Sequence, residues 1–233
     1  MPRYTSCLHC PLRETGPICG SPDKAVSNFS DALVRYSIKG KGKAIFNEAE
    51  PVDGVFFLCS GVVKLTKWLS DDKETIIDVM TPCMVFSTVA DIGGVHSLSA
   101  VTIGDNVEVA VLPARSFHAL PGMLPAIQTS VLKTVGQLLD RSRNQLAQCS
   151  LSVSERLLSA LFQLHRQFAA GPEASFSLPF SFAELAQFVH TTPESVSRVL
   201  RKLQEAGLIS IDRSGMISLL NSRPSGTAFP KKR

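Results

Sequence analysis

Short apolar runs separated by turn-forming residues fill the chain between residues 37 and 120. The turns contain glycine, proline, aspartate and asparagine, which are typical of sharp changes in chain direction. Each run is only a few residues long, as strands are. Because short strands at regular spacing favour an antiparallel barrel or jelly roll, we expect a β-roll here. The predicted strands are residues 44–46, 54–59, 62–68, 75–80, 98–103 and 108–112.

The period of the pattern changes after residue 122. From residue 123 to residue 149, apolar side chains recur at spacings of three and four or their multiples, which predicts one long helix with an apolar stripe. Such a helix either packs along its own chain or pairs with a second copy of itself. We expect a homodimer, and a monomeric helix lying on the barrel is the alternative. The expected dimer contacts are Ile127, Val131, Val135, Leu138 and Leu146.

Two helices joined by a short turn are predicted after residue 180. Ser181 and Glu184 form a capping box that begins the first helix. The second begins with Thr192 as N-cap and with Pro193 at the first helical position, where a missing N–H leaves no hydrogen bond unmade. Gly207 is expected to cap its C-terminus.

The second of these helices has two different faces. One face is apolar, and polar and basic side chains lie opposite it at spacings of three and four. Two apolar runs, 208–211 and 216–219, flank an Asp-Arg-Ser-Gly turn and predict a β-hairpin wing. With an amphipathic helix over 153–165, these elements predict a winged helix-turn-helix, whose second helix enters the major groove of DNA. The apolar positions are Val196, Val199, Leu200 and Leu203, and the polar ones are Glu194, Ser197, Arg198 and Arg201.

The polar face carries side chains that bind base edges. Arg198 can donate two hydrogen bonds to a guanine, Glu194 can accept one from a cytosine amino group, and Ser197 can adapt to either, each contact contributing roughly 1–3 kcal/mol of discrimination. The alternative is that Glu194 and Arg198 form only a surface ion pair of about half a kcal/mol. The predicted DNA-binding residues are Thr192, Glu194, Ser197 and Arg198, with Arg201, Lys202 and Arg213 better suited to phosphates.

Composition and charge narrow the function further. The 233 residues are 44% hydrophobic and 19% charged, enough to bury one large core or two small ones. Residues 1–149 carry 14 Lys and Arg against 14 Asp and Glu, whereas residues 150–233 carry 10 against 6, and a basic C-terminal third favours a polyanionic partner. No apolar run approaches the roughly 20 residues of a membrane span or the length of a signal peptide, so we expect a cytoplasmic protein with no membrane partner.

Three of the six cysteines, Cys7, Cys10 and Cys19, lie within the first twenty residues. In a reducing compartment such clustering favours metal ligation or redox chemistry over structural disulfides, and inert cysteines are the alternative. The sequence contains no glycine-rich phosphate loop and no metalloprotease or serine-hydrolase motif, so an enzyme is not expected.

The expected fold class is α+β, in four segments. These are a cysteine-containing N-terminal segment (1–28), a β-roll sensor domain (29–122), a dimerisation helix (123–149) and a winged helix-turn-helix DNA-binding domain (150–233).

Several motifs occur together along nearly the whole chain. They are the hairpin Gly-Val-Phe-Phe-Leu-Cys-Ser-Gly-Val-Val-Lys at 54–64, the long helix, the Ser-Glu-Arg-Leu start of the next helix at 154–157, and Glu194-x-x-Ser197-Arg198 in the winged segment. This combination resembles the CRP/FNR family of bacterial transcription regulators, and the last motif resembles the recognition signature of its FNR branch. The resemblance implies a β-roll like that of cyclic-nucleotide-binding domains. It also implies a homodimer that binds an inverted repeat with half-sites similar to TTGAT and contacts RNA polymerase.

The same resemblance argues against a cyclic nucleotide as the signal. Family members that bind one have a Gly-Glu-Leu turn and an Arg-Ser-Ala stretch that grip the ligand. This chain has Phe-Ser-Thr-Val at 86–89 and Leu-Ser-Ala at 98–100. A barrel without that arginine is poorly suited to bury an anion, so no cyclic nucleotide is expected.

FNR-branch members instead carry an oxygen-labile 4Fe-4S cluster on N-terminal cysteines and one cysteine of the barrel. Cys7, Cys10 and Cys19 resemble that N-terminal trio, although the interval between Cys10 and Cys19 is longer than in the type member. The resemblance therefore implies control by oxygen or redox state. Zinc, a thiol–disulfide switch and a regulator without a cluster are the alternatives.

The fourth ligand is where the sequence departs from that branch. The family's barrel position, just before Leu112-Pro113, is Ala110 in this chain. Cys83, in the turn after the strand at 75–80, is the first choice of substitute, and Cys59, inside a strand, is the second.

Overall fold

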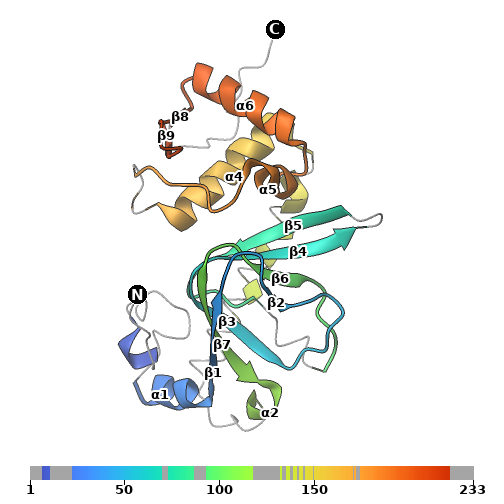
Figure 1. Ribbon diagram of the computed structural model, residues 1–233, viewed down its shortest axis with the longest axis vertical. Helices are drawn as coiled ribbons and strands as arrows, with labels where there is room; N and C mark the ends of the chain where they lie inside the picture. Colours follow the sequence, from blue (N-terminus) through green and yellow to red (C-terminus); the bar gives the residue numbers. More distant parts are fainter. Residues whose placement is uncertain are drawn as a thin grey trace. The chain divides into compact units, whose positions relative to one another are not determined.

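The chain divides into two units, residues 1–149 and residues 150–233, and each has its own buried core (Figure 1). The computed structural model describes residues 7–10, 23–69, 73–86, 93–117, 150–169, 171 and 174–220, with scattered positions between 132 and 148.

The described strands of the first unit form two antiparallel sheets, with strand orders β1-β7-β3 and β2-β6-β4-β5. The predicted antiparallel β-roll is therefore confirmed. The strands are β1 (Val34–Lys39), β2 (Ala44–Phe46), β3 (Gly54–Ser60), β4 (Val63–Leu69), β5 (Lys73–Met80), β6 (Ser99–Thr102) and β7 (Asn106–Pro113).

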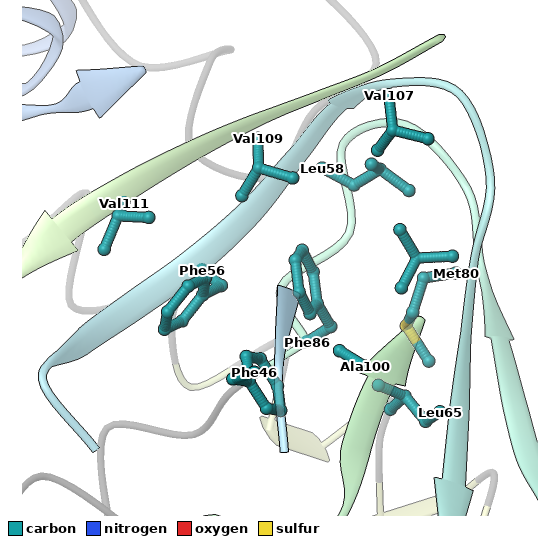
Figure 2. Packing of buried hydrophobic residues seen from close by; sticks show 11 residues of the cluster. Phe46, Phe56, Leu58, Leu65, Met80, Phe86, Ala100, Val107, Val109 and Val111 are labelled. Atoms are coloured by element: carbon teal, nitrogen blue, oxygen red, sulfur yellow. The ribbon is translucent and has the colours of Figure 1, made fainter. Parts of the chain in front are cut away.

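Both sheets contribute alternate side chains to one apolar core (Figure 2). Strand β3 contributes Phe56 and Leu58, because successive side chains of a strand point to opposite faces. Phe46 lies against Phe56 and Phe86, with ring centroids 4.9 and 5.9 Å away. These rings and their neighbours bury the apolar area that stabilises the roll. The remaining members of the core are Val63, Leu65, Met80, Ala100, Val107, Val109 and Val111.

The N-terminal elements and β1 are missing from the sequence prediction. Strand β1 lies at a sheet edge, and Val34 and Tyr36 on it are 39% and 54% exposed. Its residues nevertheless alternate between apolar and polar, and Ile38 packs against the core, so the alternation is a signal that the prediction missed. Helix α1 packs on β3 through an edge-to-face contact between Phe29 and Phe57, with ring centroids 5.4 Å apart. The helices that the prediction lacks are the N-terminal η1 (Cys7–His9, a 3-10 helix) and α1 (Asp23–Ala32) and, after β7, the short α2 (Ala114–Phe117).

The second unit is a winged helix-turn-helix, as predicted. Its elements are α4 (Val153–Phe168), α5 (Phe182–Phe188), α6 (Pro193–Glu205) and the wing strands β8 (Ile209–Ile211) and β9 (Ile217–Leu219). The predicted capping box of Ser181 and Glu184 is present. The end of α6 differs by one residue from the prediction: Ala206 is the C-cap, and Gly207 follows it in a left-handed conformation (φ +67°).

The positions that the structure describes between residues 132 and 148 are all helical, and we call this segment the linking helix. The side-chain amide of Gln145 donates to the carbonyl oxygen of Ile77 at 2.6 Å, which joins this helix to β5 within the first unit. Among the described residues, no helix is long and apolar enough to cross a membrane.

Candidate functional site

Helix α6 presents its polar face to solvent because its apolar face is anchored in the core. Val196 is completely buried, and Val199, Leu200 and Leu203 are at most 5% exposed. The hydroxyl of Thr192 accepts a hydrogen bond from the backbone N–H of Ser195 at 3.3 Å and caps the first turn. All seven predicted DNA-binding residues are exposed: Thr192, Glu194, Ser197, Arg198, Arg201, Lys202 and Arg213.

The two charged groups at the start of α6 have different partners. The guanidinium of Arg198 donates to the hydroxyl of Ser195 at 3.3 Å, and no ion pair joins it to Glu194 among the described residues. Hydrogen bonds from the backbone N–H of Glu194 itself and from Thr192 lower the pKa of the Glu194 carboxyl. Glu194 is therefore an ionised acceptor at neutral pH, as binding to a cytosine amino group requires.

Ser197 and the wing complete the surface. The hydroxyl of Ser197 donates to the carbonyl oxygen of Pro193 at 3.1 Å, which leaves its lone pairs available as acceptors. Arg213 lies at the turn of the wing, beside Asp212. The Asp212 carboxylate accepts hydrogen bonds from the backbone N–H groups of Ser214 and Met216, at 2.8 and 2.9 Å, and so fixes the turn that carries Arg213.

A residue that sequence reasoning missed holds the turn between α5 and α6. Arg156, on α4, donates to the carbonyl oxygens of Val189 and His190 at 3.1 and 3.2 Å. His190 has a left-handed backbone (φ +52°), so the turn is tight. The missed signal is the Ser152-x-x-Glu155 capping box, which begins α4 and thereby places Arg156 on its first turn.

The positive charge of the second unit is more local than the sequence count suggests. Residues 150–220 carry 6 Lys and Arg against 6 Asp and Glu. The whole excess lies in residues 221–233, outside the described residues. Residues 192–213 carry four Lys and Arg against three Asp and Glu, so the positive character of α6 and the wing depends on where their basic side chains lie and not on a large net charge.

The linking helix exposes a stripe of large apolar side chains. Of the predicted dimer contacts, Val135 and Leu146 are 46% and 73% exposed, and Ile127, Val131 and Leu138 lie outside the described residues. Leu132 and Leu139, which the predicted contact set lacks, are 72% and 49% exposed. The spacings from 132 to 135 and from 135 to 139 place these side chains on one helix face.

In the first unit, hydrogen bonds tie Cys7 to α1 and β1. The guanidinium of Arg35 donates to the sulfur of Cys7 at 3.2 Å and to the hydroxyl of Ser30 at 3.0 Å. That hydroxyl in turn accepts the backbone N–H of Cys7 at 3.1 Å. Cys10 follows closely, because its N–H donates to the carbonyl oxygen of Cys7 at 3.3 Å.

Cys59 interacts electrostatically with both N-terminal thiols. Burial raises the pKa of the Cys59 thiol to about 11, Cys7 and Cys10 add to the rise, and the Arg35 guanidinium opposes it. Cys83 lies in the turn after β5, with its N–H bonded to the carbonyl oxygen of Leu58 at 2.8 Å. Cys19 lies outside the described residues.

Cysteine sulfur is the ligand that the irons of an iron–sulfur cluster bind. Besides burial, Cys7 and Cys10 raise the pKa of the Cys59 thiol, and Arg35 donates a hydrogen bond to the sulfur of Cys7. The described residues, taken alone, contain no group of three or more Cys, His, Asp or Glu close enough to hold a metal ion. Cys19, the remaining member of the predicted ligand set, is not among the described residues.

The interior of the β-roll is occupied by aromatic side chains. The ring of His96 stacks on Phe46 at a centroid distance of 3.7 Å and is 4% exposed. Leu98 stands where the resemblance expects a phosphate-gripping arginine, and it packs against the same core. Leu98 offers no positive charge to a phosphate at that position.

Two family models match the chain. The cyclic nucleotide-binding domain matches residues 39–121, and the Crp-like helix-turn-helix domain matches residues 155–223. The matched ranges correspond to the β-roll and to the winged helix-turn-helix.

Curated relatives match over most of their length. The transcriptional regulatory protein btr of Bordetella pertussis is 27% identical over 220 residues, which cover 91% of this chain and 90% of that protein. The nitrogen fixation regulation protein FixK of Bradyrhizobium diazoefficiens is 27% identical over 222 residues, covering 92% and 90%. The solved structure of FixK2 from Bradyrhizobium japonicum has a TM-score of 0.72 at 24% identity, covering 82% of this chain and 93% of that one, and so shares its fold.

Proposed function

The chain belongs to the CRP/FNR family of DNA-binding transcription regulators, and from this premise we propose that it reads an inverted repeat with half-sites similar to TTGAT as a homodimer. We further propose that it acts in the cytoplasm, contacts RNA polymerase and is controlled by an iron–sulfur cluster on its N-terminal cysteines.

The exposed face of α6 is the observation that supports DNA reading. Glu194, Ser197 and Arg198 share that face, and none of them is needed by the hydrophobic core. Arg198 has a single neutral partner, Ser195, which a guanine can replace with two stronger acceptors. Arg201, Lys202 and Arg213 surround this group with positive charge for phosphates.

Two substitutions test this assignment. Arg198→Ala is expected to weaken binding to a TTGAT-type inverted repeat by roughly 1–3 kcal/mol, or about 5- to 150-fold, with little effect on random DNA. Lys202→Ala, four residues further along the same helix, is the matched control. It should weaken binding to the inverted repeat and to random DNA alike, and should lower by about 1 the slope with which log affinity falls with log salt concentration. Fluorescence anisotropy at several salt concentrations measures both. Equal losses on specific and random DNA for Arg198→Ala would contradict its base-reading role.

The exposed stripe on the linking helix supports the dimer. Leu132, Val135, Leu139 and Leu146 present large apolar surfaces to solvent in the single chain. Exposed apolar side chains at helical spacing are typical of a helix that packs against a second helix. An inverted repeat needs two readers related by a twofold axis, which this pairing would supply.

The thiols support control by a cluster. When bound, an iron–sulfur cluster supplies an oxygen- and redox-sensitive group. Cys7, Cys10 and Cys19 would hold it from the N-terminal segment, together with a thiol of the β-roll, for which the sequence prediction names Cys83 first and Cys59 second. Leu98, which stands in place of a phosphate-gripping arginine, supports a signal other than a cyclic nucleotide.

An anaerobic preparation tests the cluster directly. We expect a coloured protein that contains iron and sulfide and loses affinity for the repeat on exposure to air. A colourless, iron-free preparation with full affinity would contradict it. If serine at Cys7, Cys10 and Cys19 also left promoter output unchanged, the protein would be a regulator without a cluster.

A further inference from the structure

One guanidinium in the second unit binds three backbone carbonyl oxygens. Arg156 lies on α4, and its Nε donates to the carbonyl oxygen of Val189 at 3.1 Å, while Nη2 donates to that of His190 at 3.2 Å. Its Nη1 donates to the carbonyl oxygen of Leu151, just before the Ser152 N-cap of α4, at 3.3 Å. A planar guanidinium presents its donors in a fixed fork. Arg156 therefore holds the turn between α5 and α6 at a set position beside the start of α4.

The end of α5 is where such a cation is most useful. Val189 is the C-cap of α5, and the carbonyl groups at the end of a helix have no partners within that helix. The C-terminus of a helix also carries the negative end of the helix dipole, which favours a positive charge nearby. Arg156 therefore supplies the end of α5 with both hydrogen bonds and charge.

The turn itself has a strained backbone at His190. Its φ of +52° is rare for any residue with a side chain, and such conformations persist only where the surrounding structure imposes them. The N–H of Thr191 donates to the carbonyl oxygen of Ala186 at 2.9 Å on one side, and Arg156 holds the carbonyl group of His190 on the other. Thr192, the N-cap of α6, follows directly. The conformation of this turn therefore sets where α6 begins.

We infer that Arg156 is a positioning residue for sequence-specific DNA binding, which acts by fixing the start of α6 through these three hydrogen bonds. This inference rests on the proposed reading of bases by Glu194, Ser197 and Arg198. Those side chains lie on the first two turns of α6, directly after the turn that Arg156 holds. A hydrogen bond to a base edge weakens steeply with misalignment, whereas the attraction between Lys202 and a phosphate changes slowly with distance. Loss of Arg156 should therefore reduce specific binding more than general affinity for DNA.

Two matched substitutions on α4 of the full chain test this role. Arg156→Gln removes the fork, and Arg166→Gln, at an exposed position on the last turn of the same helix, removes the same charge. Fluorescence anisotropy measures the binding of each variant and of the wild type to a duplex with a TTGAT-type inverted repeat and to a random duplex.

We expect Arg156→Gln to bind the repeat about 5- to 150-fold more weakly, the range of one lost base contact, and random DNA within about twofold of the wild type. Arg166→Gln should match the wild type on both duplexes. Equal losses of Arg156→Gln on both duplexes, or no loss on the repeat, would overturn the inference. A wild type that binds both duplexes equally would instead overturn the proposed base reading.

Amide hydrogen exchange in the free protein separates positioning from overall stability. In Arg156→Gln, exchange should become faster at Thr191, in the turn, and stay unchanged at Ile217, whose N–H donates to the carbonyl oxygen of Phe176 at 2.8 Å. Equally faster exchange at both amides would show that Arg156 stabilises the whole unit, and would contradict the inference.

Arg156→Lys keeps the charge but offers one nitrogen in place of three, so we expect it to recover only part of the lost affinity for the repeat. Full recovery would overturn positioning through the three hydrogen bonds. If Arg156→Gln does not fold, Arg156→Lys takes its place in the comparison of the two duplexes. Failure of Arg156→Lys to fold would also overturn the inference, because the guanidinium would then hold the core of the unit.

Discussion

The two units of this chain build their functional surfaces in opposite ways. The proposed DNA-reading surface comes from one continuous stretch, residues 192–213, and most of it lies on a helix whose other side is buried. The surroundings of Cys7 are assembled from the 3-10 helix η1, α1 and β1, so that Cys7, Ser30 and Arg35 meet although they lie far apart in sequence. The difference shows that one unit depends on local signals and the other on strand register.

Substitutions in the cores of the two units are expected to have the largest effect, and they test whether the two units unfold separately. Leu58→Ala in the β-roll and Leu161→Ala in α4 each remove a fully or nearly fully buried leucine, and each is expected to cost about 2–5 kcal/mol. Trp68 lies on β4, so its fluorescence during urea unfolding reports the first unit. We expect Leu58→Ala to lower the Trp68 midpoint and Leu161→Ala to leave it near the wild-type value. If both substitutions shifted it equally, the units would share one cooperative core.

Local signals explain why the second unit was predictable. The capping box of Ser181 and Glu184 and the Thr192-Pro193 start of α6 involve residues at most three apart, so the sequence alone locates both helices. Those signals also identify the exposed face of α6, because its apolar positions recur at helical spacing.

Pairings over long sequence distances explain what was missed. Arg156 binds carbonyl oxygens 33 and 34 residues away, and Arg35 binds the sulfur of Cys7 across 28 residues. Neither pairing leaves a periodic pattern in the sequence. The linking helix also depends on distant parts of the chain. The spacing of its apolar residues predicts a stripe, but the exposure of Leu132 and Leu139 depends on what packs beside the helix.

Substitutions at two glycines of the β-roll are expected to have an effect of intermediate size, and they test how much the close approach of paired strands contributes to stability. Gly61 and Gly42 both have a left-handed backbone, with φ +87° and +73°. A Cβ at Gly61 would lie 2.7 Å from the carbonyl oxygen of Asn106, whereas nothing lies within 4 Å of one at Gly42. Gly61→Ala should therefore destabilise the first unit by about 1–3 kcal/mol more than Gly42→Ala, measured by Trp68 fluorescence in urea. Equal effects would mean that only backbone strain matters at these turns.

The smallest expected effect is the pH dependence of the stability of the wing turn. Hydrogen bonds from the side chain of Ser214 and the backbone of Met216 lower the pKa of the Asp212 carboxyl from its ordinary value of 3.8. Because the folded-state pKa is lowered, the stabilisation is complete above about pH 3.8 and is lost as the pH falls through the lower folded value. The amide NMR signals of Ser214 and Met216 should titrate with a midpoint below 3.8, and in Asp212→Asn this titration should vanish. A midpoint at or above 3.8 would show that these local bonds do not favour the carboxylate.

Selection of binding sites from a pool of randomised duplex DNA tests the central claim most directly. The full-length protein is kept without oxygen, and the retained duplexes are sequenced. If α6 reads bases from two chains related by a twofold axis, the selected sites will be inverted repeats with half-sites similar to TTGAT. Enrichment of a single asymmetric half-site, or no enrichment over random DNA, would contradict the account.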